Sequence, residues 1–329
     1  MNKYLKKLLL SLTVSFLVIG LVGYYFLFPT VLNFLGKQHR DKVAKELDLS
    51  CNTLKVGENV FEFFEGGKGK EVMILIHGFE GNKLSWLSFL PSLKEHYHLI
   101  VLDLPGHGGS FLPENHQLNI YGFADDLETF ITAKGLKSFH LFGQSMGGGV
   151  SSLYAAKRPE TIKTLILLNP LGVDLPEKST LQVKIDQGKN FLFPQNIADL
   201  DEFARLLTGK PFPWNSFQKW IVVQKIKQKE KFYEVVYNNF LCKTVPIDEI
   251  LPTIEVPVLL LYGEKDNILH PSSFYKFHRL IPNIRTKVFE EGHHLFLGAC
   301  LKEAIEEVQM VTENGIKEKK LITSAAPQG

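Results

Sequence analysis

The stretch Phe139-His140-Leu141-Phe142-Gly143-Gln144-Ser145-Met146-Gly147-Gly148-Gly149-Val150 indicates a strand, a tight turn and a helix in immediate succession. Its apolar start, residues 139–142, predicts a short strand, and residues 150–157 predict a helix. The Gly-x-Ser-x-Gly turn between them would hold Ser145 in a strained backbone conformation, with its hydroxyl raised above the sheet edge. Glycines flank the serine because a side chain there would collide with the neighbouring strand or helix.

Strand and helix patterns alternate on both sides of this turn. Continuous apolar runs, typical of buried parallel strands, occupy residues 72–76, 99–102, 162–168, 256–262 and 285–289. Helical patterns occupy residues 86–93, 121–134, 272–280 and 302–312, and a hairpin is expected at 53–56 and 59–64. This alternation predicts the α/β class, with a mostly parallel sheet and right-handed crossovers.

Residues 171–250 interrupt the alternation with helices alone. Four helices are expected there, at residues 181–189, 197–207, 215–226 and 231–240. We interpret the region as a helical cap inserted between two parts of the α/β core, residues 50–170 and 251–312. Aromatic side chains are concentrated in it, and they could face lipid or could pack the cap onto the core: Phe191, Phe193, Phe212, Trp214, Phe217 and Trp220.

The amino-terminal region predicts a membrane anchor. Residues 8–36 contain no charged side chain, and this run is longer than the roughly 20 residues that cross a hydrocarbon core. Because aromatic residues and Pro29 close the run, we expect an uncleaved single-pass anchor over residues 1–36, with a cleaved signal peptide as the alternative. At the other end, residues 313–329 are expected to be a disordered tail.

Composition narrows the class of function. The 329 residues carry a net charge of +2, which gives no reason to expect a nucleic-acid partner. Cys51, Cys242 and Cys300 are widely spaced and lack a metal-binding pattern, so neither a disulfide framework nor a zinc site is expected. The oligomeric state cannot be read from these features.

Three residue types that suit nucleophilic catalysis follow predicted strands in the order Ser145, Asp266 and His293. The carboxyl ends of parallel strands meet at one edge of a sheet, so these side chains should lie close together. A serine hydroxyl needs a base such as histidine, and a carboxylate would orient that base. Asp174 is the alternative acid, and His294 is the alternative base beside His293.

A tetrahedral intermediate also requires backbone N–H donors for its oxyanion. We expect these donors at Met146, directly after the serine, and at Phe79, in the loop after the strand at 72–76. His77, His107 and Asp103 are expected to brace the surrounding loops by hydrogen bonds rather than to take part in the chemistry.

Five motifs together resemble the α/β-hydrolase superfamily: His77-Gly78-Phe79, Asp103-x-Pro105-Gly106-x-Gly108, Gly143-x-Ser145-x-Gly147-Gly148, Gly263-x-x-Asp266 and Gly292-His293. Over residues 70–310 the chain resembles the membrane-anchored monoacylglycerol lipases of the domain-6 type and related bacterial lipases. The resemblance implies hydrolysis of monoacylglycerols or other lipid esters without a cofactor. It implies Ser145 as nucleophile, Asp266 as acid and His293 as base. It also implies Phe79 and Met146 as oxyanion donors.

Two other functions are compatible with parts of the pattern. Hydrolases that cleave carbon–carbon bonds in ring-cleavage products share the Ser-Met-Gly-Gly sequence and a helical cap, but their soluble substrates require no membrane anchor. A membrane-tethered binding protein on the same scaffold is the third interpretation. The presence of all three triad residue types disfavours it.

Overall fold

The computed structural model describes residues 28–114, 116–174, 177–239, 246–316 and 320–324. The chain divides into two compact units, residues 1–43 and 44–329. In the second unit, the described residues form a nine-stranded sheet with the order β1-β2-β4-β3-β5-β6-β7-β8-β9. This sheet positions every candidate site residue.

The strands agree closely with the apolar runs of the sequence. β1 and β2 form the expected hairpin, β2 also pairs antiparallel with β4, and the remaining neighbours are parallel. The strands are β1 Leu49–Val56, β2 Asn59–Gly66, β3 Val72–Ile76, β4 His98–Leu102, β5 Phe139–Gln144, β6 Ile162–Leu168, β7 Val258–Gly263, β8 Ile284–Phe289 and β9 Lys320–Ser324. All six residues of β5 are buried, as both faces of a central parallel strand should be.

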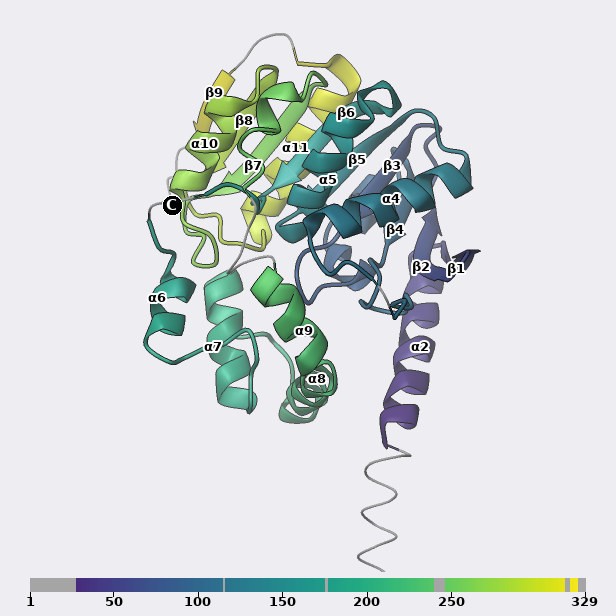
Figure 1. The fold of residues 1–329 in the computed structure, drawn as a ribbon, viewed down its shortest axis with the longest axis vertical. Coiled ribbons are helices and arrows are strands. Elements are labelled where there is room, and N and C mark those ends of the chain that lie inside the picture. The colour runs from purple at the N-terminus through teal and green to yellow at the C-terminus, as the bar shows by residue number, and fades with distance from the viewer. Residues whose placement is uncertain (1–27, 115, 175–176, 240–245, 317–319, 325–329) are drawn as a thin grey trace, which may run out of the picture. The chain divides into compact units, whose positions relative to one another are not determined.

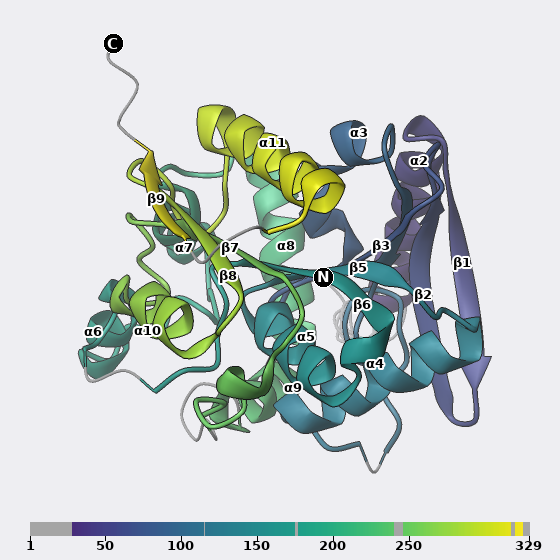
Figure 2. The same ribbon diagram turned by 90° about the horizontal axis from the view of Figure 1, so that it is seen from above.

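Helices cover both faces of the sheet. In Figure 2, α4, α5 and α10 lie on one face, and α3 and α11 lie on the other. Their apolar sides close the core, so this is the α/β architecture expected from the alternating pattern. The bounds are α3 Leu90–Leu93, α4 Ile120–Lys134, α5 Met146–Lys157, α10 Ser272–Leu280 and α11 Gly298–Asn314. Short 3₁₀ turns lie at η2 Lys83–Trp86, η3 Pro159–Thr161 and η5 Leu251–Thr253.

The four helices expected between residues 171 and 250 are present between β6 and β7. They are α6 Thr180–Asp186, α7 Ile197–Thr208, α8 Ser216–Gln228 and α9 Glu230–Tyr237, and they form a layer beyond one edge of the sheet (Figure 1). Asparagine side chains at residues 196 and 215 cap the first turns of α7 and α8. The cap aromatics divide between the two expected roles: Phe191 and Phe193 pack on an apolar cluster inside the cap, whereas Trp214, Phe217 and Trp220 are exposed.

The carboxyl-terminal region differs from the expected disordered tail over residues 313–329. Helix α11 continues to Asn314, and β9 pairs in parallel with β8 at the sheet edge. The segment Lys320–Ser324 is short, but the unpaired backbone of β8 offers it a ladder of hydrogen bonds. Sequence composition alone does not reveal such a long-range pairing.

The expected membrane anchor over residues 1–36 lies mostly outside the described residues. From Phe28 onward the chain is helical, and this helix, α2 Phe28–Glu46, continues ten residues beyond the end of the uncharged run. Within the part of the chain that the structure describes, no helix is long and apolar enough to cross a membrane.

Candidate active site

Ser145 stands at the turn between β5 and α5 with φ +53°, in the left-handed region that non-glycine residues seldom adopt. Its N–H donates to the carbonyl of Leu168 at 3.0 Å, which fixes the turn against the end of β6. A side chain at Gly143 would lie 2.4 Å from the carbonyl oxygen of Gly147, and one at Gly147 would lie 2.4 Å from the carbonyl oxygen of His77. The glycines are therefore required by close backbone approach, as the pentapeptide predicts.

The loop after β3 lies directly against this serine. A Cβ on Gly78 would lie 2.9 Å from the Cβ of Ser145 and 3.5 Å from its Oγ. The next residue along the loop is Phe79, and the residue after the serine, Met146, opens α5. Because the first N–H groups of a helix have no partner within the helix, the N–H of Met146 is available to a bound oxyanion.

His77 braces the loop in a single tautomer. The N–H of Leu104 donates to Nε2 of His77 at 3.1 Å, so Nδ1 carries the proton and donates to the carbonyl of Gly78 at 2.8 Å. Burial lowers the pKa of His77, which favours this neutral form. His107 is also buried, and its Nδ1 lies 3.1 Å from the carbonyl of Pro105. Both histidines therefore have the bracing role expected from the sequence.

A buried ion cluster fixes the second loop beside the site. The Asp103 carboxylate accepts hydrogen bonds from the N–H and the ammonium of Lys83, both at 2.6 Å, and from the N–H of Gly109 at 2.8 Å. The same ammonium lies 2.6 Å from the Glu62 carboxylate. Asp103 therefore ties down the 105–109 turn, in agreement with the structural role expected for it.

Asp266 follows β7 and pairs with His294. Its Oδ1 accepts from the N–H groups of Ile268 and Leu269 at 2.8 and 3.0 Å, and its Oδ2 lies 2.7 Å from Nδ1 of His294. Both members of the pair are buried. Asp174, the alternative acid, is exposed after β6. This pairing leaves the other ring nitrogen of His294, Nε2, to face a substrate or a nucleophile.

The expectation for His293 is corrected by this geometry. The His293 ring points toward the cap, where a Cβ on Gly209 would lie 2.4 Å from Nε2, and its Nδ1 has no hydrogen-bond partner among the described residues. Burial lowers the pKa of His293. The two rings leave the loop after β8 in different directions, and His294 is the one that lies against Asp266. In the structure, His294 rather than His293 pairs with Asp266.

Asn169 was not singled out in the sequence, yet it joins the elements of the site. This residue directly follows β6 and has φ +43°, and its Nδ2 donates to the carbonyls of His293 and His294 at 3.0 and 2.9 Å. Its Oδ1 accepts from the N–H of Gly263, at the end of β7, at 2.8 Å. An asparagine directly after an apolar strand, Ile162–Leu168, was the available signal, because asparagine tolerates positive φ.

Glu80, directly after Phe79, is a buried acid in the same loop. It has φ +56°, and neither carboxyl oxygen has a hydrogen-bond partner among the described residues, although the rest of the residue is partly exposed. Burial raises the pKa of Glu80 well above the ordinary value of a glutamate. Folding therefore shifts the equilibrium of this carboxyl group toward its protonated form, relative to a glutamate in water.

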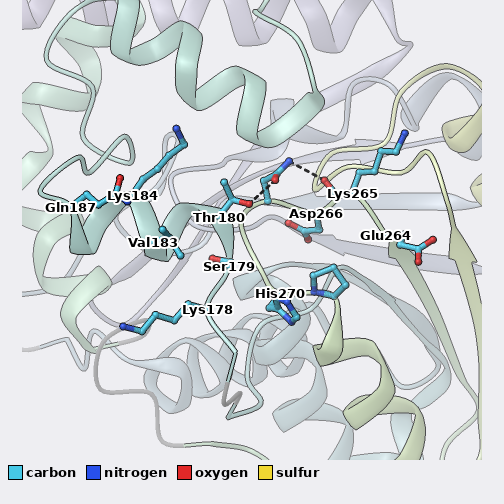
Figure 3. A pocket seen from close by; sticks show the side chains of 12 residues that line it. Lys178, Ser179, Thr180, Val183, Lys184, Gln187, Glu264, Lys265, Asp266 and His270 are labelled. Carbon is cyan, nitrogen blue, oxygen red and sulfur yellow. Dashed lines mark hydrogen bonds between the residues drawn. The ribbon is translucent and has the colours of Figure 1, made fainter.

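A groove of about 550 Å³ lies beside the site, between α6 and the loop after β7 (Figure 3). Its lining includes Asp266 but neither Ser145 nor His294. The lysines that line it, Lys178, Lys184 and Lys265, each form an ion pair with an acidic side chain, which neutralises their charge. In the described part of the chain, no group of three or more potential ligand side chains is arranged to hold a metal ion.

Comparison with known proteins agrees with the α/β architecture described above. The family described as the alpha/beta hydrolase fold matches residues 71–205. The chain has the α/β-hydrolase fold. It is 27% identical to lipase 1 of Psychrobacter immobilis over 81% of this chain and 84% of that protein. It is 28% identical to monoacylglycerol lipase ABHD6 of Homo sapiens over 73% of this chain and 75% of that protein.

A solved structure of a membrane phospholipase A, described as a bacterial virulence factor, superposes on this chain with a TM-score of 0.79. The two sequences are 29% identical, and the match covers 95% of this chain and 99% of the other. The resemblance to α/β-hydrolases of the lipase type is confirmed by these matches.

Proposed function

We propose that this chain hydrolyses carboxylic esters of lipids, such as monoacylglycerols, through an acyl-enzyme formed on Ser145. The observation that carries the proposal is the buried Asp266–His294 pair, 2.7 Å apart, in the loops that follow β7 and β8, since these parallel strands end at the same sheet edge as β5, which leads into the Ser145 turn. The names of the relatives, which are lipases and a phospholipase, support the broader class of carboxylic ester hydrolase.

The residues present can supply each step of acyl transfer. Nε2 of His294 takes the proton of Ser145 Oγ as the oxygen attacks the ester carbonyl, and Asp266 stabilises the imidazolium that forms. N–H groups of Phe79 and Met146 would donate to the oxyanion. The imidazolium then protonates the departing alcohol, and a water molecule, deprotonated by the same nitrogen, releases the acid from the serine.

The apolar surroundings of the site suit an acyl chain. Phe79 packs against the apolar cluster of the cap, and Ile268, two residues after Asp266, packs against the same cluster. Phe79 also meets Tyr233 of α9 edge to face, with the ring centroids 5.6 Å apart. A hydrocarbon chain that leaves the ester would therefore meet apolar side chains of the cap rather than water, which favours a lipid ester.

Labelling and turnover together test the proposal. Wild type and Ser145→Ala would be exposed to a fluorophosphonate probe and assayed on p-nitrophenyl butyrate, on a monoacylglycerol and on a ring-cleavage dienoate. Both labelling and ester turnover should disappear in the variant. A folded wild type that reacts with no probe would refute the serine mechanism, and turnover of the dienoate alone would favour the carbon–carbon hydrolase.

We also propose that residues 1–36 anchor the chain in a membrane. The support is the uncharged run over residues 8–36, together with the membrane phospholipase among the similar structures. After expression of the full chain, the protein should remain in the membrane pellet during alkaline carbonate extraction. Release into the supernatant would contradict an integral anchor.

A further inference from the structure

The outer end of the cap carries exposed aromatic rings that no step of the proposed reaction uses. Trp214 is 38% exposed, Phe217 is 67% exposed and Trp220 is 36% exposed. The chain has three tryptophans, and the remaining one, Trp86, is 1% exposed in the core. Exposing two large indole rings in water is unfavourable, so this surface indicates an environment other than bulk solvent.

The rings are arranged in two stacked pairs. Phe212 and Trp214 lie with their centroids 4.2 Å apart and an interplanar angle of 24°, and Phe217 and Trp220 lie 6.0 Å apart at 20°. Stacking limits the rotamers of these side chains, so the rings form a preformed apolar surface. We call these four residues the cap patch.

Helix α8, which carries half of the cap patch, contributes little to the core. Of its thirteen residues only Val223 is buried. It packs against α7 and α9, and the ion pair of Lys219 with Asp201 of α7, at 2.7 Å, holds it in place. Figure 1 shows α8 at the end of the cap that lies away from the sheet. The aromatics on α8 are therefore not needed to join the cap to the core.

Positive charge surrounds the cap patch. Residues 210–231 contain six lysines and one glutamate, with no arginine or aspartate, which gives this segment a net charge of +5. Since the whole chain carries +2, the remaining residues carry −3. Residues 210–231 are therefore a local concentration of positive charge on the cap, which complements a surface that bears negative charge.

We propose that the cap patch and its lysines form a docking surface for a lipid bilayer that contains anionic headgroups. Indole and phenyl rings partition to the level of the headgroups, and lysine side chains lie well between lipid phosphates. A second copy of the chain fits this surface poorly, because an isologous contact would bring two segments of charge +5 together. The proposal rests on the proposed function only in the expectation that the docked cap receives its substrate from the bilayer.

Tryptophan fluorescence gives a direct test with the full chain. The segment 1–36 contains no tryptophan, so an amino-terminal anchor is silent, and buried Trp86 serves as an internal reference. The Ser145→Ala protein would be reconstituted into phosphatidylcholine vesicles with or without phosphatidylglycerol, with brominated acyl chains as quenchers. Using this variant separates docking from hydrolysis.

In vesicles with phosphatidylglycerol, we expect bromolipid to quench about half of the emission, because two of the three tryptophans reach the interface. The double variant Trp214→Phe, Trp220→Phe should lose nearly all quenching. Phe217→Asp should reduce quenching at least about threefold by placing a carboxylate in the interface. Phe111→Asp, at a position 54% exposed outside the cap, is the matched control and should leave quenching unchanged.

The lysines are tested separately from the rings. Lys225→Glu together with Lys227→Glu should weaken quenching in the anionic vesicles and have little effect in phosphatidylcholine alone. An unquenched parent protein in anionic vesicles would overturn the proposal. A dimer that forms without lipid, is measured by sedimentation and is abolished by Phe217→Asp would also overturn the proposal. That result would assign the cap patch to contact with a second copy of the chain.

Discussion

Replacing His294 with glutamine is expected to lower kcat for ester hydrolysis by about 10⁴- to 10⁶-fold, whereas His293→Gln should change it by less than about tenfold. The first change removes the ring that Asp266 holds at 2.7 Å, and with it the base of the proposed mechanism. The second removes a ring that lies against Gly209 of the cap.

The magnitude follows from what each ring contacts. Loss of four to six factors of ten in rate corresponds to about 5–8 kcal/mol of transition-state stabilisation, at about 1.36 kcal/mol for each factor. Nδ1 of His293 has no hydrogen-bond partner among the described residues, so its replacement breaks no bond at that atom and leaves the pair of Asp266 with His294 intact. A tenfold change would correspond to about 1.4 kcal/mol.

Both variants and Asp266→Asn would be assayed on p-nitrophenyl butyrate, with thermal unfolding as the control for folding. Asp266→Asn should lower kcat by about 10⁴-fold, because an amide cannot hold the imidazole in the required tautomer. A loss of about 10⁴-fold or more in His293→Gln, with His294→Gln still active, would refute the assignment of the base.

Three further outcomes follow from the same contacts. Asn169→Gly keeps the positive φ but removes three hydrogen bonds, so the free energy of unfolding should fall by about 2–4 kcal/mol. We also expect kcat to fall by a larger factor than KM rises. An unchanged kcat would exclude a role of Asn169 in positioning the site. Because the pKa of Glu80 is raised in the folded state, this residue lowers the stability of the wild type as pH rises above about 4.3, the pKa in the unfolded state, and Glu80→Gln removes that loss. In urea unfolding at about pH 4.5 and about pH 7, the free energy of unfolding of the variant should therefore exceed that of the wild type by an amount that grows with pH. A difference that does not depend on pH would contradict this. Lys83→Met leaves the buried carboxylate of Asp103 without its cation and should destabilise the fold by about 3–5 kcal/mol. Lys68→Met, at an exposed pair, should leave the free energy of unfolding nearly unchanged, and similar losses in the two variants would be inconsistent with a buried cluster.

Local patterns were enough to predict the fold class and most of the candidate site. Apolar runs of four to seven residues identify the central strands, because strands buried on both faces leave no place for polar side chains. The glycines around Ser145 report a close backbone approach that any sequence in this turn must satisfy. Asp266 follows from its place directly after a strand, since the carboxyl ends of parallel strands meet at one sheet edge.

Tertiary structure decided the features that depend on residues far apart in the chain. The choice of His294 over His293 depends on which ring faces an acid 28 residues away, and the anchoring role of Asn169 depends on carbonyls up to 125 residues away. Two consecutive histidines in a loop give almost the same sequence pattern, whichever of them faces the acid. Likewise, composition groups the cap aromatics together. Only packing separates the partly buried Phe193 from the exposed Phe217, because burial depends on neighbours that the chain brings from elsewhere.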